Sequence, residues 1–262
     1  MHARRQRGRF GPAVLTGSLL TALGVFWALP PRPALAFGER TAVDLRSVDY
    51  DGDKAPRPTA SQRLSWEVRQ RTSVETRLQP TRVRLSDPRL FESPFLYWSG
   101  DSAFAPLSDA EAVGLKRFVE FGGFVLIDDA APEQDGFDAS VRRELTRAFG
   151  AGALTRLPAT HTIYRSFYLL DRPVGRVEGA DYLEAVMHGA RAAVVYSRHD
   201  LGGAWDRDNL GNYLHAVDPG GEVQREMAIR MGVNLVLYAL CLDYKDDQVH
   251  APFIMRRRAG QH

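Results

Sequence analysis

Charged and imidazole side chains gather in short polar segments that directly follow apolar runs of the chain. The segments are Asp51-Gly52-Asp53, Ser99-Gly100-Asp101, Asp128-Asp129 and Ser197-Arg198-His199-Asp200. Carboxylates can act as general acids or bases or can bind a hard cation. An arginine can hold a carboxylate or phosphate through two N–H groups at once. These four segments therefore hold most of the residues that could do chemistry.

The pair Asp128-Asp129 is the sharpest of these signals. Adjacent residues at a strand end point to different sides, so at most one of the two normally faces a given pocket. One interpretation is a general acid/base or a cation ligand. The other is a carboxylate that accepts hydrogen bonds from a loop or a helix N-terminus. The second interpretation is favoured for one of the pair, and both stay open for the other.

Arg198 and Asp200 stand two residues apart and are expected on one side of an extended strand exit. Arg198 could grip an anionic ligand, or it could pair with Asp128 or Asp129 across the rim, which is the favoured alternative. Trp205 follows Gly202-Gly203. It could stack on a sugar or another ring, or it could cover the core beneath a loop.

His161 lies in a turn after Pro158 and could titrate near neutral pH or bind a metal, although a histidine hydrogen-bonded within its loop is the favoured alternative. No recognised metal-ligand spacing, nucleophile elbow, dinucleotide-binding glycine motif or P-loop is present. Cys241, the single cysteine, lies in an apolar stretch and is expected to pack in the core. One cysteine also excludes an intrachain disulfide and a cysteine-based zinc site.

These segments must be positioned by strands and helices in alternation. Residues 42–50 alternate apolar and polar, and residues 95–99 (FLYWS), 124–127 (FVLI) and 192–196 (AAVVY) are continuous apolar runs. Such runs are typical of strands in a parallel sheet that is covered on both faces. Ligands bind at the carboxyl ends of such strands, so the four polar segments should meet on one rim.

Helices are predicted between these strands. Ser61 can cap a helix over residues 62–71, and Ser108 with Glu111 forms a capping box before a helix that ends at Gly122-Gly123. Asp138 opens a helix that ends at Phe149, and a last helix spans residues 223–242 with a mostly apolar second half. The predicted fold is a three-layer α/β sandwich with a mostly parallel sheet and helices on both faces.

The N-terminus predicts export. Residues 1–36 carry five Arg and no acid, then an uncharged stretch over residues 10–31, then Ala34-Leu35-Ala36 as a cleavage site. The cleavage site favours a removed signal peptide over a retained membrane anchor. Without these residues the chain has 29 basic and 32 acidic groups, which argues against nucleic-acid binding. The predicted organisation is a signal or anchor over 1–36, one domain over 41–245 and a tail over 246–262.

Five blocks of the sequence resemble one bacterial family, the domain-of-unknown-function family 4159. They are residues 87–100 (DPRLFESPFLYWSG), the helix and strand that end at Gly122-Gly123 and Asp128-Asp129, residues 161–168 (HTIYRSFY), residues 196–202 (YSRHDLG) and residues 232–240 (GVNLVLYAL). The resemblance covers residues 41–242.

The resemblance implies a flavodoxin-like or class I glutamine-amidotransferase-like fold, related in shape to domains of the trehalose-utilisation type. It implies an exported or membrane-attached setting, and the family has no established activity. Members often carry His where this chain has Asp101. The amidotransferase-type cysteine is also missing, which argues against glutaminase activity.

Two functions are carried forward from the sequence. The first is a non-catalytic binding or interaction module of the bacterial envelope, without a cofactor, whose partner is a small polar ligand, a glycan or an envelope protein. Its candidate binding residues are Gly100, Asp101, Arg198, Asp200 and Trp205. The alternative is a hydrolase that uses strand-end aspartates together with a histidine, with or without a divalent cation; its candidate catalytic residues are Asp128, Asp129 and His161. Contact with a membrane is expected only through an uncleaved N-terminus.

Overall fold

The computed structural model describes residues 42–52 and 54–259, with side chains described up to residue 241. The predicted signal or anchor lies outside the described residues. In chain order, the strands are β1 (Arg46–Asp49), β2 (Arg82–Arg84), β3 (Phe95–Gly100), β4 (Phe124–Asp129), β5 (Leu154–Arg156), β6 (Glu184–His188) and β7 (Arg191–Ser197). The α-helices are α1 (Ala60–Arg71), α2 (Asp109–Glu120), α3 (Asp135–Phe149), α4 (Leu201–Trp205) and α5 (Gly221–Ala259), and the short 3-10 helices are η1 (Pro88–Glu92) and η2 (Thr162–Arg165).

The strands form one sheet in the order β2-β1-β3-β4-β7-β6-β5. Strands β2, β1, β3, β4 and β7 are parallel, whereas β6 runs antiparallel to β7 and β5 antiparallel to β6. The predicted α/β class with a mostly parallel sheet is therefore confirmed. The antiparallel edge was not predicted, because β5 is only three residues long and neither β5 nor β6 is a continuous apolar run.

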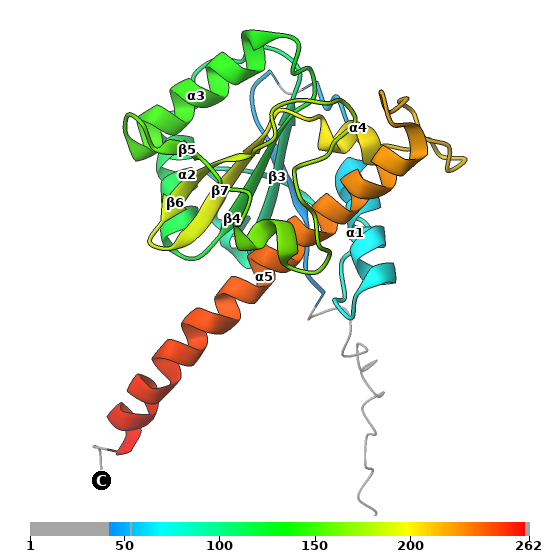
Figure 1. Ribbon diagram of the computed structural model, residues 1–262. Coiled ribbons are helices and arrows are strands. Elements are labelled where there is room, and N and C mark those ends of the chain that lie inside the picture. Colours follow the sequence, from blue (N-terminus) through cyan, green and yellow to red (C-terminus); the bar gives the residue numbers. More distant parts are fainter. Residues whose placement is uncertain (1–41, 53, 260–262) are drawn as a thin grey trace, which may run out of the picture. The chain divides into compact units, whose positions relative to one another are not determined.

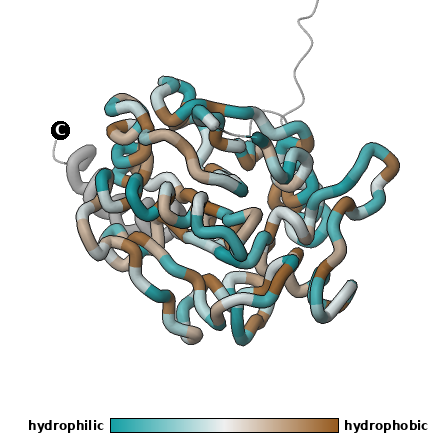
Figure 2. Tube along the Cα trace, turned by 90° about the horizontal axis from the view of Figure 1, so that it is seen from above, coloured by the Kyte–Doolittle hydropathy of each residue, from teal (hydrophilic) through white to brown (hydrophobic). Residues whose placement is uncertain are grey.

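Two hydrophobic clusters cover the two faces of the sheet and make the three layers visible in Figure 1. One cluster joins the sheet to α1, α4 and α5, and the other joins it to α2 and α3. Figure 2 shows hydrophilic and hydrophobic residues mixed along much of the trace. This mixture is expected of helices that bury one face against a sheet.

Local signals fix some helix ends and miss others. Ser108 and Glu111 form the predicted capping box, in which the serine hydroxyl accepts from Glu111 N and the glutamate accepts from Ser108 N. The prediction that Ser61 caps α1 is wrong, since the helix begins at Ala60, two residues before the predicted start, and Ser61 lies within its first turn. The residue before the helix, Thr59, instead donates its hydroxyl to Asp206, 2.6 Å away.

The last helix is longer than predicted, because α5 continues to Ala259 through most of the predicted tail. Its apolar face is buried as far as Ala239, and the hydroxyl of Tyr238 accepts from Ala192 N at the amino end of β7. Cys241 comes almost one turn later and is exposed, so the predicted core role for this thiol is wrong. No helix in the described part of the chain is both long and apolar enough to cross a bilayer.

Candidate functional site

The four predicted polar segments lie along one rim, because their strands are adjacent and parallel. The strand register places Ser99 beside Asp128, Gly100 beside Asp129 and Asp128 beside Ser197. Asp51 and Gly52 follow β1, the next strand along the sheet. The sequence thus predicts the convergence of the segments correctly, while the contacts of each side chain differ from one residue to the next.

Asp128 is completely buried and holds the start of α4. Its carboxylate accepts from Leu201 N at 2.9 Å, from Gly202 N at 2.7 Å and from the Tyr97 hydroxyl at 3.0 Å. Burial, helped by the neighbouring Asp200, raises the pKa of Asp128, and the two backbone N–H bonds oppose the shift. This is the helix-capping role that the sequence allowed for one residue of the pair.

Asp129 faces the other side of the sheet and is also fully buried. It accepts from Ala131 N at 3.1 Å, and Arg198 Nε lies 3.4 Å from its carboxylate. Burial raises the pKa of Asp129 to about 6, against the Ala131 bond and the Arg198 charge. The structure thus contains the Arg198–Asp129 pair that the sequence favoured over a free anion-binding arginine.

Asp200 turns away from Arg198, so the expectation that the two share one side is wrong. Asp200 has φ +50° and ψ +58°, a left-handed conformation in which the chain reverses sharply between β7 and α4. Its buried carboxylate caps Gly203 N at 2.9 Å. It also receives two hydrogen bonds from Arg57, at 2.8 and 2.6 Å, and one from Arg176. Both arginines were missed in the sequence.

Glycine and tryptophan at the rim serve packing. A Cβ on Gly100 would lie 2.2 Å from the Phe137 ring and 2.5 Å from the Tyr50 hydroxyl, which leaves no room for a ligand at this backbone. Trp205 is completely buried, and its indole N–H donates to Ala228 O at 3.0 Å. Trp205 therefore cannot be a stacking platform; it belongs to the core between α4 and α5, as the blander interpretation allowed.

The two histidines of interest are far from one another along the strands. His161 packs on Tyr238, with ring centroids 5.4 Å apart, near the amino ends of the strands, and its Nδ1 accepts from Ile163 N. It is therefore at the wrong end of the sheet to act with Asp128 or Asp129. His199 is at the rim, where burial lowers its pKa. Its Nε2 donates to Ala180 O at 2.7 Å, which leaves Nδ1 as acceptor toward Ser197.

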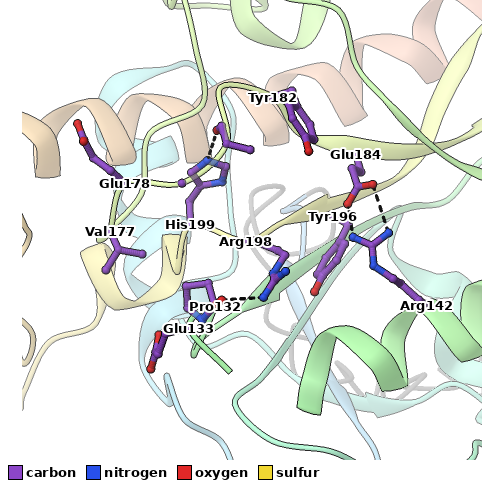
Figure 3. A pocket seen from close by; sticks show the side chains of 12 residues that line it. Pro132, Glu133, Arg142, Val177, Glu178, Tyr182, Glu184, Tyr196, Arg198 and His199 are labelled. Carbon is purple, nitrogen blue, oxygen red and sulfur yellow. Dashed lines mark hydrogen bonds and ion pairs between the residues drawn. The ribbon is translucent and has the colours of Figure 1, made fainter. Parts of the chain in front are cut away.

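Beside Asp129, a pocket of about 430 Å³ opens at the carboxyl ends of β4 and β7. Figure 3 shows its floor, formed by Arg198, Tyr196 and the Arg142–Glu184 ion pair. Its other walls are Pro132 and Glu133 after β4 and the segment Val177–Tyr182, with His199 between them. The sequence analysis did not predict most of these residues, because they come from α3, β6 and the long connection before β6 and not from the segments that follow the predicted strands. Asp101, Asp200 and Trp205 do not line this pocket.

Backbone hydrogen bonds fasten the outer wall of the pocket to the rim. Arg176 N donates to Asp200 O at 3.2 Å and Val177 N to His199 O at 3.3 Å. Gly175 permits this approach, because a Cβ there would lie 2.1 Å from His199 O. Among the described residues, no group of three or more His, Cys, Asp and Glu side chains could hold a metal ion. The rim therefore offers a polar pocket next to carboxylates that are already engaged.

Comparison with curated proteins gives no match. The family described as domain of unknown function (DUF4159) matches residues 44–240. This range contains all seven strands, the rim, the pocket and the buried part of α5. The chain therefore belongs to the DUF4159 family.

Proposed function

We propose that the protein is a non-catalytic binding module of the bacterial envelope that holds a small polar ligand in the pocket beside Arg198. One observation carries the proposal. The carboxylates of Asp128, Asp129 and Asp200 each accept hydrogen bonds from backbone N–H groups and contact a tyrosine or an arginine, while a pocket of ligand size lies open next to them.

The engaged carboxylates argue against the hydrolase alternative. A catalytic base must reach a substrate proton, and a nucleophile needs an accessible lone pair. Asp128, Asp129 and Asp200 have no exposed surface. Both nitrogens of His199 are hydrogen-bonded, and His161 is at the other end of the sheet.

The envelope setting is supported by the sequence alone. The basic, apolar and small-residue pattern of residues 1–36 is that of an exported protein. Both fates of this segment, removal and retention as an anchor, are compatible with a binding module. Blotting cell fractions with an antibody against the folded domain distinguishes them by fraction and by apparent mass.

A thermal-shift screen of the purified protein tests binding. A ligand that binds only the folded state at about 100 times its Kd adds about 2.7 kcal/mol, which for a domain of this size raises Tm by about 5–10 °C. The Glu178→Ala/Tyr182→Ala variant alters the outer wall of the pocket and should lose this shift while keeping the Tm of the free protein. Glu120→Ala, an exposed acid at the end of α2, is the matched control.

Two results would count against the proposal. One is a ligand shift that the wall variant retains in full, which would place the ligand elsewhere. The other is turnover of a compound from a substrate panel by the native protein, if that activity is lost in Asp128→Asn or Asp129→Asn. Such a result would support the hydrolase alternative.

A further inference from the structure

Some polar groups of the pocket have hydrogen-bonding capacity to spare. Arg198 Nη2 donates to Pro132 O at 2.7 Å, but Nη1 has only Asp138 as an ion-pair neighbour, 3.9 Å away. In the part of the chain that the structure describes, no hydrogen bond engages Nη1, the Tyr182 hydroxyl or the Glu133 carboxylate. The pocket therefore presents a donor on its floor and both donor and acceptor groups on its walls.

The charges around Arg198 disfavour an anionic ligand. Its guanidinium already has the carboxylates of Asp129, Asp135 and Asp138 within 4 Å. The pocket itself is lined by three glutamates and two arginines. A further anion on the floor of the pocket would be repelled by those of the carboxylates that Arg198 does not neutralise.

A cationic ligand meets the opposite obstacle. Arg142 and Arg198 both face the pocket, and each is held there by its own carboxylates, so neither can move away freely. A cation on the floor would approach two fixed guanidinium groups. A neutral hydroxyl avoids both penalties, because it donates to a glutamate and accepts from an arginine without adding charge.

Part of the lining is apolar. Pro132 and Val177 contribute aliphatic surface, and the Tyr182 ring stands on the wall, with the Arg156 guanidinium 4.2 Å from its centroid. A ligand with a C–H face and a hydroxyl-bearing edge matches this combination of surfaces. Sugars have this shape, whereas small inorganic ions and amino acids do not.

We infer that the pocket takes a neutral carbohydrate, of about one or two hexose units, with hydroxyl groups on Arg198 Nη1 and Glu133 and a C–H face toward Tyr182. This inference rests on the proposed function, since it names the ligand class of the same pocket. It predicts little dependence of affinity on salt, because no net charge is brought in.

The test compares sugars that differ only in charge. Titration calorimetry of the full-length protein uses glucose, galactose, mannose and their disaccharides, then glucuronic acid and glucosamine as charged partners of glucose. At least one neutral sugar should bind at least tenfold more tightly than its acidic and amino counterparts, with less than a twofold change between 20 and 500 mM NaCl. Glu133→Ala and Tyr182→Ala should each weaken binding about tenfold, and Glu120→Ala should not.

The outcomes separate the inference from the proposed function. One contrary result is that the charged sugars, an amino acid or phosphate bind more tightly than any neutral sugar and lose affinity in the same variants. That result would overturn the inference of a neutral carbohydrate ligand but would still support the proposed binding function. No binding by any compound at millimolar concentration, with Tm unchanged throughout, would overturn both. The Tm of each variant shows whether lost binding reflects lost folding.

Discussion

Arg57 should be among the most costly single residues to remove from the rim. Its side chain is 11% exposed and the side chain of Asp200 is fully buried. Arg57→Met would delete two charge-assisted hydrogen bonds of 2.8 and 2.6 Å and leave Asp200 with Arg176 as its remaining cation. Breaking a buried ion pair from one side costs about 3–5 kcal/mol, and the presence of Arg176 places the expected loss near 3 kcal/mol.

A double-mutant cycle isolates the interaction. Asp200→Asn keeps a side chain that tolerates the left-handed backbone and can still cap Gly203 N, but it removes the buried charge. With that charge absent, Arg57→Met should cost about 2 kcal/mol less than in the native protein. Urea unfolding followed by the fluorescence of the buried Trp98 and Trp205 measures each corner of the cycle.

A surface pair supplies the control, and the cycle has a clear failing result. Arg69 and Glu75 are 3.1 Å apart but well exposed, so Arg69→Met should change the free energy of unfolding by less than about 0.5 kcal/mol. If Arg57→Met lowers the free energy of unfolding by less than about 1 kcal/mol, or if the effects of the two substitutions are additive, the ion pair between Arg57 and Asp200 does not stabilise the rim.

Three further predictions concern the same rim and its supports. Burial raises the pKa of Asp129 from 3.8 to about 6, so the native protein loses stability as pH rises through this window. The free energy of unfolding of Asp129→Asn, measured in urea and compared with that of the native protein, should therefore rise by up to about 3 kcal/mol between pH 4 and pH 7. A difference that does not change with pH would contradict the raised pKa of Asp129. Gly202→Ala would place a Cβ 2.1 Å from the Tyr97 hydroxyl and should destabilise the protein by about 1–3 kcal/mol; a neutral effect would mean that the Tyr97–Asp128 contact is not tight. Ser108→Ala removes the capping box and should lower the free energy of unfolding by about 1 kcal/mol with an unchanged denaturant slope, whereas no loss would show that Glu111 alone secures the helix start.

Local sequence signals predict the frame of this protein well. The apolar runs at residues 95–99, 124–127 and 192–196 become β3, β4 and β7, because a strand buried on both faces needs no polar residue. Their shared direction places the polar segments on one rim without any knowledge of tertiary contacts. The capping box is equally local and equally reliable.

Long-range partners could not be predicted in this way. Arg57 lies 143 positions from Asp200 in the sequence, and nothing near it announces that pairing. The hydrogen-bonded role favoured for His161 is confirmed by its bond from Ile163 N, but the sequence could not show that the fold carries this turn to the amino ends of the strands. For Trp205 the sequence left a ligand platform and a core role both open, and the glycines before it decide for the core, because they let α4 pack closely and bury the indole.

The outer wall of the pocket comes from a single stretch of chain. Residues 157–183 connect the two antiparallel edge strands, β5 and β6, and the part from Val177 to Tyr182 faces the cavity. Ile163 and Tyr164, earlier in this stretch, pack in the core beneath the sheet, whereas Val177, Glu178 and Tyr182 lie outside it. The wall segment alone can therefore vary without disturbing the strands, provided that its attachment at Gly175 and Arg176 is kept. Relatives could thus exchange this one loop and acquire different ligand preferences on an unaltered scaffold, as antibodies do with their hypervariable loops.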